Sequence, residues 1–450
     1  MADYESLRTR WGRSPAEGAD LDTRRDFGSR LRTVDRDGAN APACAARTVE
    51  SLAPGLVAGG LDRFLAGHTD AATPFLVVDL DVVRRQYASL TTALPGTEVF
   101  YAVKANPAPE VLRLLIRLGS HFDVASRGEI ELCLGLGADP ARLSYGNTVK
   151  KERDIAAAYR CGVRLFAVDS RPELDKVLRT VACGTVFVRI VTDGAGADWP
   201  LSRKFGCTVG EAEQMLLQAA RAGLQVGVSF HVGSQQRNPG AWDRPLSQVA
   251  HLKRLLMAAG HELAGVNLGG GLPSRHLDPT ADIETYGEAI AGSVATHLGP
   301  RFGGLMMVEP GRYLVGDAGV IRTEVVQIVR RASDPDRRWV FLDVGLFNGL
   351  TETLGEAIRY RIQAPGDGSG TGPVVLAGPS CDSADVLYET YQYQLPLDLQ
   401  VGDHLEILGT GAYTSSYSSV GFNGFPPLTS YYVPAAAGYL PAAAGSGLTS

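Results

Sequence analysis

The sequence predicts an α/β fold: a parallel (β/α)8 barrel followed by a C-terminal, mainly antiparallel β domain of the barrel or sandwich type. Short apolar runs alternate with amphipathic helical stretches through the middle of the chain, as buried parallel strands alternate with the helices that cover them. Eight such units occur, the number that closes this barrel. After about residue 320 helical patterns become scarce and strand-like runs take over. An open α/β sheet would show the same alternation of strands and helices. The alternation therefore favours the barrel but does not exclude an open sheet.

The elements follow in order along the chain. Residues 1–46 are polar and of mixed charge, which predicts a disordered extension because few apolar side chains offset the entropy of ordering. Residues 47–82 are expected to form a helix and a strand, TPFLVVDLD, that joins the β domain. Residues 83–318 form the expected barrel, with strands beginning near Val99, Phe122, Leu143, Leu165, Val186, Val226, Val266 and Leu305. Residues 319–433 hold the β domain, and the low-complexity residues 434–450 form a flexible tail.

Length and charge exclude several classes of function. A chain of 450 residues is too long for one ordinary domain. Its 43 basic and 49 acidic residues give a net charge of −6, which argues against binding to nucleic acid or an anionic membrane. The N-terminal residues contain no apolar signal region, and no run approaches the roughly 18–20 apolar residues that span a bilayer. Six cysteines without a CxxC pair suit the reducing cytoplasm, where we expect the protein.

Polar residues gather where the predicted barrel strands end, which is where the active sites of such barrels lie. They are Lys104, Asp123, Ser126, Asn147, Asp169, His231, Ser234, Gly269, Gly270, Gly271, Glu309 and Arg312. Each alone has an ordinary interpretation, such as a solvated lysine, a tight glycine turn or a core histidine. Their convergence on one rim predicts a functional site.

The combination of residue types predicts pyridoxal 5′-phosphate as the cofactor. Lys104 lies in YAVKANP without a charged neighbour, and a partly desolvated lysine has a lowered pKa and can form an imine with an aldehyde. Three consecutive glycines allow backbone N–H groups to approach a phosphate, and Arg312 can clamp it with two hydrogen bonds. Glu309 supplies an acidic partner for the pyridine nitrogen.

The sequence contains no motif for a metal, a nucleotide phosphate or a dinucleotide cofactor. The sequence contains no HExxH, and its eight histidines show no metal-ligand spacing, so no metal site is expected. It contains no GxxxxGK[ST] loop, and the GxG of GAGAD lacks the strand–helix context of a dinucleotide site.

Seven motifs in the chain resemble those of one family. They are YAVKANP (101–107), FDVASRGEIE (122–131), HVGSQ (231–235), NLGGGLP (267–273), VEPGRYLVGDAG (308–319), GPSCDSADVLYE (378–389) and GAYT with FNGF (411–425). In this order, from about Thr73 to Tyr432, they resemble the alanine-racemase-fold (fold type III) pyridoxal-phosphate decarboxylases, in the ornithine/lysine decarboxylase branch.

The resemblance implies a role for each matching residue. Lys104 would form the imine with the cofactor, with Asp123 and Glu129 as its electrostatic and hydrogen-bond partners. His231 would stack on the cofactor ring and Glu309 would pair with its nitrogen. The remaining implied cofactor contacts are Arg189 near the ring hydroxyl, Ser234, Gly269, Gly270, Gly271, Arg312 and Tyr413 at the phosphate, and Gly311 of the EPGR motif. Cys381 and Asp382 would reach into the neighbouring subunit's site across a two-fold homodimer, with Cys381 as the proton donor to Cα.

The implied reaction is decarboxylation of a basic L-amino acid, ornithine or lysine, to a diamine. Eukaryotic relatives in this branch place an aspartate after the VFLDVG-like strand to receive the distal amine of the substrate. Here the register puts Glu356 at that place, and helical spacing would put Glu352 one turn earlier on the same face. We therefore expect Glu356, helped by Glu352, to bind the distal amine together with Asp382.

Several alternatives stay open at this point. Diaminopimelate decarboxylases share much of the pattern, although EPGRY and GAYT with FNGF favour the ornithine/lysine side. Alanine racemases are shorter and lack the CDSAD motif. Non-catalytic regulators related to these enzymes lack the full cofactor set, which this chain retains. An enzyme of specialised metabolism that acts on another diamino acid also matches, and the sequence does not determine the preferred amino acid or its stereochemistry.

Overall fold

The computed structural model describes residues 60–201, 204–300, 302–366 and 370–435. The expected disordered extension, residues 1–46, lies outside the described residues, as does the flexible tail apart from residues 434 and 435. Of the lead-in region 47–82, the described part forms helix α1 (Gly60–Gly67) and strand β1 (Phe75–Asp79).

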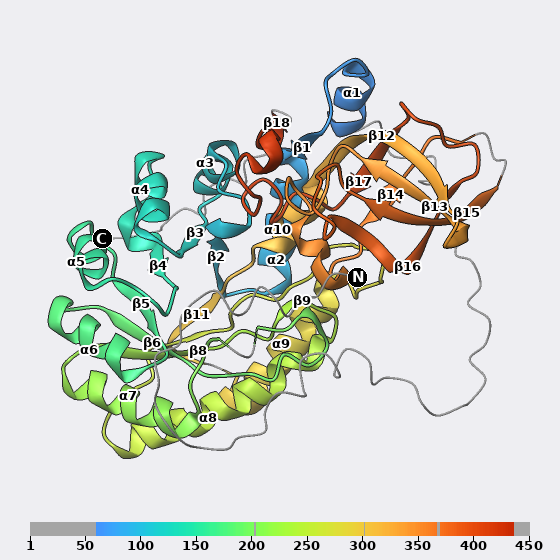
Figure 1. Ribbon diagram of the computed structural model, residues 1–450. Helices are drawn as coiled ribbons and strands as arrows, with labels where there is room; N and C mark the ends of the chain where they lie inside the picture. The colour runs from blue at the N-terminus through green and yellow to red at the C-terminus, as the bar shows by residue number, and fades with distance from the viewer. Residues whose placement is uncertain (1–59, 202–203, 301, 367–369, 436–450) are drawn as a thin grey trace, which may run out of the picture. The chain divides into compact units, whose positions relative to one another are not determined.

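Eight parallel strands close into a barrel, which confirms the predicted (β/α)8 architecture and excludes an open sheet (Figure 1). Around the barrel they are β2 (Glu98–Ala102), β3 (His121–Val124), β4 (Leu143–Tyr145), β5 (Leu165–Val168), β6 (Thr185–Arg189), β8 (Gln225–Ser229), β10 (Gly265–Asn267) and β11 (Leu305–Val308). The circle closes because β11 pairs in parallel with β2. A separate two-stranded ribbon pairs β7 (Ala197–Trp199) with β9 (Ser234–Gln236).

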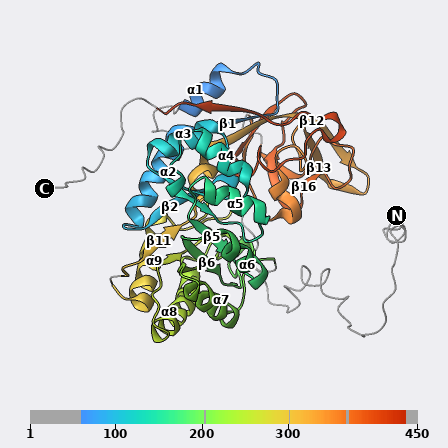
Figure 2. The same ribbon diagram turned by 90° about the vertical axis from the view of Figure 1, so that its left-hand side faces the viewer.

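Helices cover the outside of the barrel, as Figure 2 shows for α3 to α9. They are α2 (Leu80–Ala93), α3 (Pro109–Arg117), α4 (Arg127–Gly135), α5 (Glu152–Arg160), α6 (Arg171–Thr180), α7 (Val209–Arg221), α8 (Asp243–Ala258) and α9 (Ile283–Leu298). Local sequence sets where they begin: Thr208 and Glu211 form a reciprocal capping box at α7. Their apolar faces turn inward, and α3 buries Val111, Leu112, Leu114 and Leu115.

Large side chains pack inside the barrel. Phe100, Phe187 and Met307 pack there as one buried cluster. Phe187 has room because glycine faces it from a neighbouring strand: a Cβ on Gly227 would lie 2.4 Å from its ring. The interior is therefore a packed core, and the chemistry is left to the C-terminal rim.

The C-terminal domain is a mixed, mainly antiparallel sheet built around the long strand β12 (Gly319–Arg331). The other strands are β13 (Asp334–Leu342), β14 (Arg361–Gln363), β15 (Thr371–Ala377), β16 (Val386–Pro396), β17 (His404–Leu408) and β18 (Thr429–Val433). Strand β1 pairs antiparallel with β12, so the expected early strand lies in this sheet. Two pairs, β1 with β18 and β13 with β15, are parallel.

A segment of the β domain packs against the rim of the barrel. The N–H of Tyr413 donates to the carbonyl of Ala105 at 2.9 Å, and the amide of Asn106 donates to the carbonyl of Gly411 at 3.0 Å. The hydroxyl of Ser416 donates to the carbonyl of Lys104 at 3.1 Å. The residues around Lys104 thus come from both domains.

Two chain-wide features bear on function. Among the described helices, none has the length and apolar composition that crossing a membrane requires. Within the same described ranges, no cluster of three or more His, Cys, Asp or Glu side chains is arranged to hold a metal ion.

Candidate active site

Six strand ends bring chemically active side chains to one rim of the barrel. Parallel strands present their carboxyl ends on the same side, so residues far apart in the sequence meet there. The side chains are Lys104 just after β2, Asp123 on β3, Arg189 at the end of β6, His231 after β8, Asn267 at the end of β10 and Glu309 just after β11. The structure thus brings together the predicted Lys104, Asp123, Arg189, His231 and Glu309.

Three other predicted rim residues hold loops in place. The hydroxyl of Ser126 caps α4 by accepting the N–H of Glu129 at 3.2 Å. The amide of Asn147 donates to the carbonyl of Ala125, and the carboxylate of Asp169 accepts the N–H of Gly206 at 3.0 Å. In each case the partner is a backbone group.

Lys104 forms an ion pair with Asp123 at the rim. Its Nζ lies 2.9 Å from Oδ2 of Asp123, and 48% of its side chain is still accessible to solvent. The expectation of a lowered lysine pKa is wrong. Burial does lower it, but the negative charges of Asp123 and Glu309, with the Tyr413 hydroxyl, outweigh burial and raise the pKa of Lys104 above its ordinary value. The amine is therefore held as a charged, oriented group.

Glu129 supports this pair indirectly. Its carboxylate accepts the N–H of Ala125 at 2.6 Å, next to the Ser126 cap, rather than bonding to Lys104. Burial raises its pKa, and the nearby charge of Asp123 raises it further. The second oxygen of Asp123 has room because Gly146 faces it: a Cβ there would lie 1.9 Å from Oδ1. Within the described residues this buried oxygen has no hydrogen-bond donor.

Glu309 is a half-buried carboxylate held by one amide. The Nδ2 group of Asn267 donates to its Oε1 at 2.5 Å, while the Oδ1 atom of Asn267 accepts the N–H of Gly269 at 2.9 Å. Burial raises the pKa of Glu309 to about 7, the charge of Asp123 raises it as well, and Lys104 partly opposes both. Near neutral pH this group is poised to gain or lose a proton.

The raised pKa of Glu309 predicts a pH-dependent stability of the chain without cofactor. The folded state keeps the proton to higher pH than the unfolded state, so this contribution to stability is fully present below about pH 4.5 and is lost as pH rises through about 7. The loss is on the order of 3 kcal/mol at 1.36 kcal/mol per pKa unit. Urea unfolding from pH 5 to 8 should show it as the difference between wild type and Glu309→Gln. Parallel curves for the two proteins would contradict the raised pKa.

His231 is neutral and faces the glycine triplet. Its Nδ1 accepts the N–H of Gly233 at 3.0 Å, which leaves the proton of the neutral ring on Nε2. Burial lowers its pKa well below the ordinary range, and the charges of Arg189 and Lys104 lower it further. Desolvation also lowers the pKa of Arg189, although Glu309, Asp169 and Asp123 counteract this. Neutral His231 can lie against a flat ring without placing a charge on it.

The glycine triplet forms a cradle that only glycine allows. A Cβ on Gly270 would lie 2.7 Å from the carbonyl oxygen of Glu309 and 2.9 Å from Nε2 of His231. Gly269 has φ +67° and Gly271 has φ +116°, which disfavour any larger residue. Across the described ranges, the N–H of Gly270 meets no acceptor. This N–H is free to donate to an anion.

Arg312 begins α10 (Arg312–Val315), and its guanidinium binds two partners at once. It forms a buried, two-hydrogen-bond ion pair with Glu352 and donates to the hydroxyl of Ser234. Gly311 precedes it, and a Cβ there would lie 3.3 Å from the hydroxyl of Tyr413. Ser234, Gly311, Arg312 and Tyr413 are thus neighbours, as the prediction of a phosphate site requires.

The prediction that Glu352 and Glu356 share a helical face is wrong. Residues Thr351–Glu356 form a 3₁₀ segment broken by extended backbone at Leu354 and by φ +63° at Gly355. The kink separates the two carboxylates, and Glu352 turns inward to Arg312. Both carboxylates are already bound to protein groups, so we do not assign the substrate amine to either.

Glu356 binds the backbone of β16. Its carboxylate accepts the N–H groups of Glu389, Thr390 and Tyr391 at 2.7–2.8 Å. These residues lie where the pairing register between β15 and β16 shifts. Glu356 therefore satisfies backbone donors that the sheet leaves unpaired.

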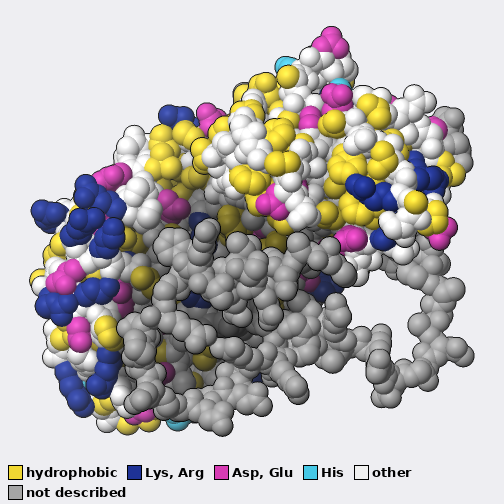
Figure 3. All heavy atoms as spheres, viewed as in Figure 1, with side chains coloured by type: hydrophobic (Ala, Val, Ile, Leu, Met, Phe, Trp, Pro, Cys, Tyr) yellow, Lys and Arg dark blue, Asp and Glu magenta, His cyan; other side chains and the backbone are white. Residues whose placement is uncertain are grey.

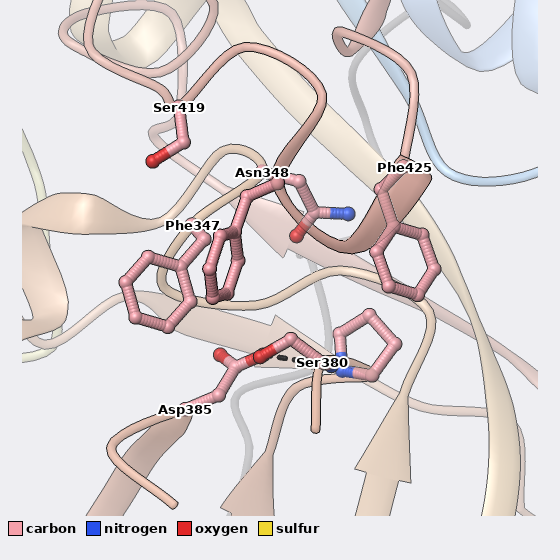
Figure 4. Close-up of a pocket in the computed structure, with 8 residues that line it drawn as sticks. Phe347, Asn348, Ser380, Asp385, Ser419 and Phe425 are labelled. Carbon is pink, nitrogen blue, oxygen red and sulfur yellow. Dashed lines mark hydrogen bonds between the residues drawn. The ribbon is translucent and has the colours of Figure 1, made fainter. Parts of the chain in front are cut away.

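Cys381 and Asp382 lie on an exposed loop of the β domain. The thiol of Cys381 lies 3.4 Å from Oδ1 of Asn423, and Asp382 accepts the N–H of Ala384. Buried Asp385 fixes this loop by accepting the N–H groups of Leu346 and Ser380 at 2.7 and 3.0 Å. Figure 4 shows the pocket beside it, lined by Phe347, Asn348, Pro379, Ser380, Asp385, Ser419, Phe422 and Phe425. Within the described residues, the contacts of Cys381 and Asp382 join them to this domain and not to Lys104.

Sequence reasoning missed three supporting residues. Asn267 orients Glu309, Gly146 makes room for Asp123, and Asp385 anchors the loop that carries Cys381. Asn267 and Asp385 lie inside the quoted NLGGG and CDSAD motifs, so their positions carried a signal. No local signal marked Gly146, because its role depends on a neighbouring strand.

The residues present fit pyridoxal 5′-phosphate. An accessible amine lies beside a carboxylate, and a half-buried carboxylate of raised pKa lies on the same rim. The cradle at Gly270 would be filled by any Cβ and offers an N–H without an acceptor in the described part of the chain. Lys104 would hold the aldehyde carbon, Glu309 the ring nitrogen, and the triplet with Ser234 the phosphate.

Comparison with known proteins agrees with this fit. Residues 80–316 match the family model described as pyridoxal-dependent decarboxylase, pyridoxal binding domain. The lysine/ornithine decarboxylase of Selenomonas ruminantium is 38% identical over 357 residues, which are 78% of this chain and 88% of that protein. The structure of the Vibrio vulnificus lysine/ornithine decarboxylase complexed with cadaverine superposes with a TM-score of 0.73 at 28% identity, covering 83% of this chain and 98% of that one. A protein named antizyme inhibitor 2, from Xenopus laevis, is 32% identical and covers 82% of this chain and 83% of its own length.

Proposed function

This chain belongs to the fold type III pyridoxal-dependent decarboxylases, and from that premise we propose that it converts a basic L-amino acid, ornithine or lysine, to a diamine. The observation that carries the proposal is one rim that presents the amine of Lys104 and the carboxylate of Glu309 beside a glycine cradle. A regulator without catalytic activity would not need the amine, the carboxylate and the glycine cradle together. Relatives named for lysine and ornithine support the substrate class.

Each residue of the site has its own role in the reaction. When bound, pyridoxal 5′-phosphate supplies an electron sink for the electron pair left on Cα as CO2 departs. Lys104 would hold the cofactor through its amine. Glu309 would hold a proton at the ring nitrogen, and the neutral imidazole of His231 would lie against the ring.

The active site is completed by a second copy of the chain. Cys381 and Asp382 are exposed and bonded within their own β domain, so their side chains remain available to a partner. The β domain also exposes apolar side chains: Leu354, Tyr417, Val420 and Phe422. Figure 3 shows hydrophobic side chains exposed on the β domain in the view of Figure 1. A two-fold dimer would bury such a surface and bring Cys381 of the partner subunit to Cα as proton donor.

Asp382 of the partner subunit is the proposed ligand of the distal amine. The two glutamates first expected there, Glu352 and Glu356, are bound to Arg312 and to β16. Asp382 has an exposed carboxylate with one local hydrogen bond, so it can accept a charge-assisted bond from an ammonium.

Mixing two inactive variants tests the shared site. In a heterodimer, one chain carries Lys104→Ala and the other carries Cys381→Ala. Each site combines Lys104 of one chain with Cys381 of the other, so one site has both lesions and the other has neither. With random exchange and independent sites, activity should recover to roughly a quarter of wild type. A mixture of Lys104→Ala and Glu309→Ala is the matched control, because both lesions lie on the barrel rim and no intact site can form. Equal, negligible recovery in the two mixtures despite proven exchange would contradict the shared site.

A substrate panel tests the proposed specificity. CO2 release is measured with L- and D-ornithine, L- and D-lysine, L-arginine, diaminopimelate and L-norvaline. We expect kcat/KM for L-ornithine or L-lysine to exceed that for L-norvaline by roughly 30- to 1000-fold, because a buried ammonium gains a charge-assisted hydrogen bond that norvaline lacks. A preference for diaminopimelate would instead identify the chain as a diaminopimelate decarboxylase. Cofactor binding without CO2 release from any of them would contradict the proposal.

We also propose a cytoplasmic location. The five cysteines within the described ranges, Cys133, Cys161, Cys183, Cys207 and Cys381, are free thiols, as is usual in a reducing compartment. The free thiol of Cys381 is also the form that a proton donor requires.

A further inference from the structure

Asn423 holds Cys381 at two points. Its side-chain oxygen, Oδ1, accepts the backbone N–H of Cys381 at 3.2 Å and the thiol S–H at 3.4 Å. The two residues lie 42 positions apart in the sequence, so two separate segments of the β domain meet at this oxygen: the cysteine loop (residues 378–385) and the asparagine turn (residues 421–425). A thiol that donates carries its proton, and because it is a weak donor it can leave this bond at small cost.

The backbone of the asparagine turn suits an asparagine. Asn423 has φ +53°, in the left-handed region that asparagine tolerates better than most residues with a side chain. Gly421 and Gly424 beside it also have positive φ, and the N–H of Gly424 donates to the carbonyl of Gly421 at 3.0 Å. The local backbone therefore fixes the direction in which the Asn423 side chain leaves the turn.

The cysteine loop and the asparagine turn are attached to the same stretch of chain. The carboxylate of Asp385 accepts the N–H groups of Ser380 and Leu346, which ties the cysteine loop to that stretch (Figure 4). The ring of Phe422, in the asparagine turn, packs against the ring of Phe347 with 4.6 Å between their centres. The spacing between the loop and the turn is thus set within one chain, before any partner is present.

We propose that Asn423 is a positioning residue for the proton donor: it holds the thiol of Cys381 protonated and in one orientation until the proton is needed. The proposal rests on the proposed function, in which Cys381 of the partner subunit protonates Cα. As the proton leaves sulfur, the electron pair left on Cα by the departing CO2 forms the new C–H bond, and the thiolate takes a proton from water. A thiol held in one orientation adds its proton to one face of the carbon.

Alkylation of Cys381 in the full chain freed of cofactor tests the contact directly. The rate of its reaction with iodoacetamide at fixed pH, read from peptide maps, reports how readily the thiol loses its proton. Asn423→Asp keeps an acceptor and adds a negative charge beside the sulfur, so Cys381 should react about three- to tenfold more slowly. Asn423→Gly keeps the left-handed turn but removes the acceptor, so Cys381 should react about two- to fivefold faster.

The stereochemistry of the product tests the consequence. In D2O the loaded wild type should give a diamine with deuterium on one face of the carbon that lost CO2, and therefore a single stereoisomer. Asn423→Gly should give a mixture of both stereoisomers, because a thiol without its acceptor no longer has one orientation. Its rate of CO2 release should fall by about tenfold or less, since loss of CO2 precedes the transfer from the thiol.

Ser419→Ala is the matched control. Ser419 lines the pocket beside the cysteine loop, and its backbone N–H donates to the carbonyl of Phe347 whichever side chain it carries. Neither the alkylation rate of Cys381 nor the stereochemistry should change in this variant. The exposed thiols of Cys161 and Cys183, mapped in the same experiment, should react equally in all variants and so report an unchanged fold.

Two results would overturn the proposal. Equal alkylation rates of Cys381 in wild type, Asn423→Asp and Asn423→Gly would show that the amide does not hold the thiol. A single stereoisomer from Asn423→Gly would show that the orientation of the thiol is set elsewhere. Failure of the proposed function looks different: the alkylation rates would change as expected, but wild type would release no CO2 from any amino acid, and Cys381 would then have no proton to deliver.

Discussion

Replacing Lys104 by alanine is expected to lower kcat/KM for the preferred basic amino acid by about 10³-fold or more, since removing a covalent catalytic group usually costs this much. The structure gives the reason. Lys104 supplies the amine at the rim that lies 2.9 Å from Asp123 and within the field of Glu309. Without it the cofactor is bound only by the glycine cradle and its neighbours. Steady-state CO2 release measures the effect.

Lys104→Arg is the matched control for the loss of the amine. Arginine keeps the positive charge beside Asp123 but is too weakly nucleophilic to bind an aldehyde, so it should be as inactive as Lys104→Ala. Methylamine should restore part of the activity of Lys104→Ala, where space is left, and none in Lys104→Arg. Borohydride reduction of the loaded wild type should label Lys104 in peptide maps. Near-normal turnover in Lys104→Ala, or a label on another lysine, would remove Lys104 from this role.

Glu309→Gln should lower kcat by about 10²- to 10³-fold, the usual cost of losing one preorganised charge at the reacting system. Glutamine preserves the shape and can still accept from Asn267, but it carries no negative charge. The carboxylate that would hold a proton on the ring nitrogen is then absent. The Kd for pyridoxal 5′-phosphate should change less than tenfold, because Lys104 and the phosphate subsite are intact.

The conservative variant Glu309→Asp separates charge from shape. It keeps the carboxylate but withdraws it by one methylene, so its kcat should lie between wild type and Glu309→Gln. A Glu309→Gln enzyme with wild-type kcat would show that the carboxylate is not needed at this nitrogen. A large loss of cofactor affinity instead would indicate a role in binding.

The barrel could be predicted because the sequence pattern that produces it is local. Buried parallel strands need apolar runs and their helices need amphipathic faces, so the alternation repeats through the middle of the chain. The convergence of Lys104, His231 and Glu309 was predictable for the same reason, since strand ends in a barrel face one way. Residues 434–450 and 1–46 are not part of this agreement, as nearly all of them lie outside the described residues.

The failed predictions depended on contacts between distant segments. Spacing of four residues suggested that Glu352 and Glu356 share a helix face, but Gly355 takes a left-handed conformation and ends the helical path. Their partners, Arg312 and the backbone of β16, lie too far along the chain to be read from local pattern. The pKa of Lys104 was misjudged in the same way. Asp123 and Glu309, on other strands, reverse the effect of burial.

The central claim is decarboxylation at Cα by a rim built around Lys104 and Glu309, and product analysis in D2O tests it most directly. The loaded enzyme is incubated with L-ornithine and L-lysine, and both the diamine and the remaining amino acid are examined by mass spectrometry. We expect one CO2 per diamine, with one non-exchangeable deuterium on the carbon that lost CO2. Deuterium in recovered, racemised amino acid without diamine or CO2 would contradict it and identify a racemase instead.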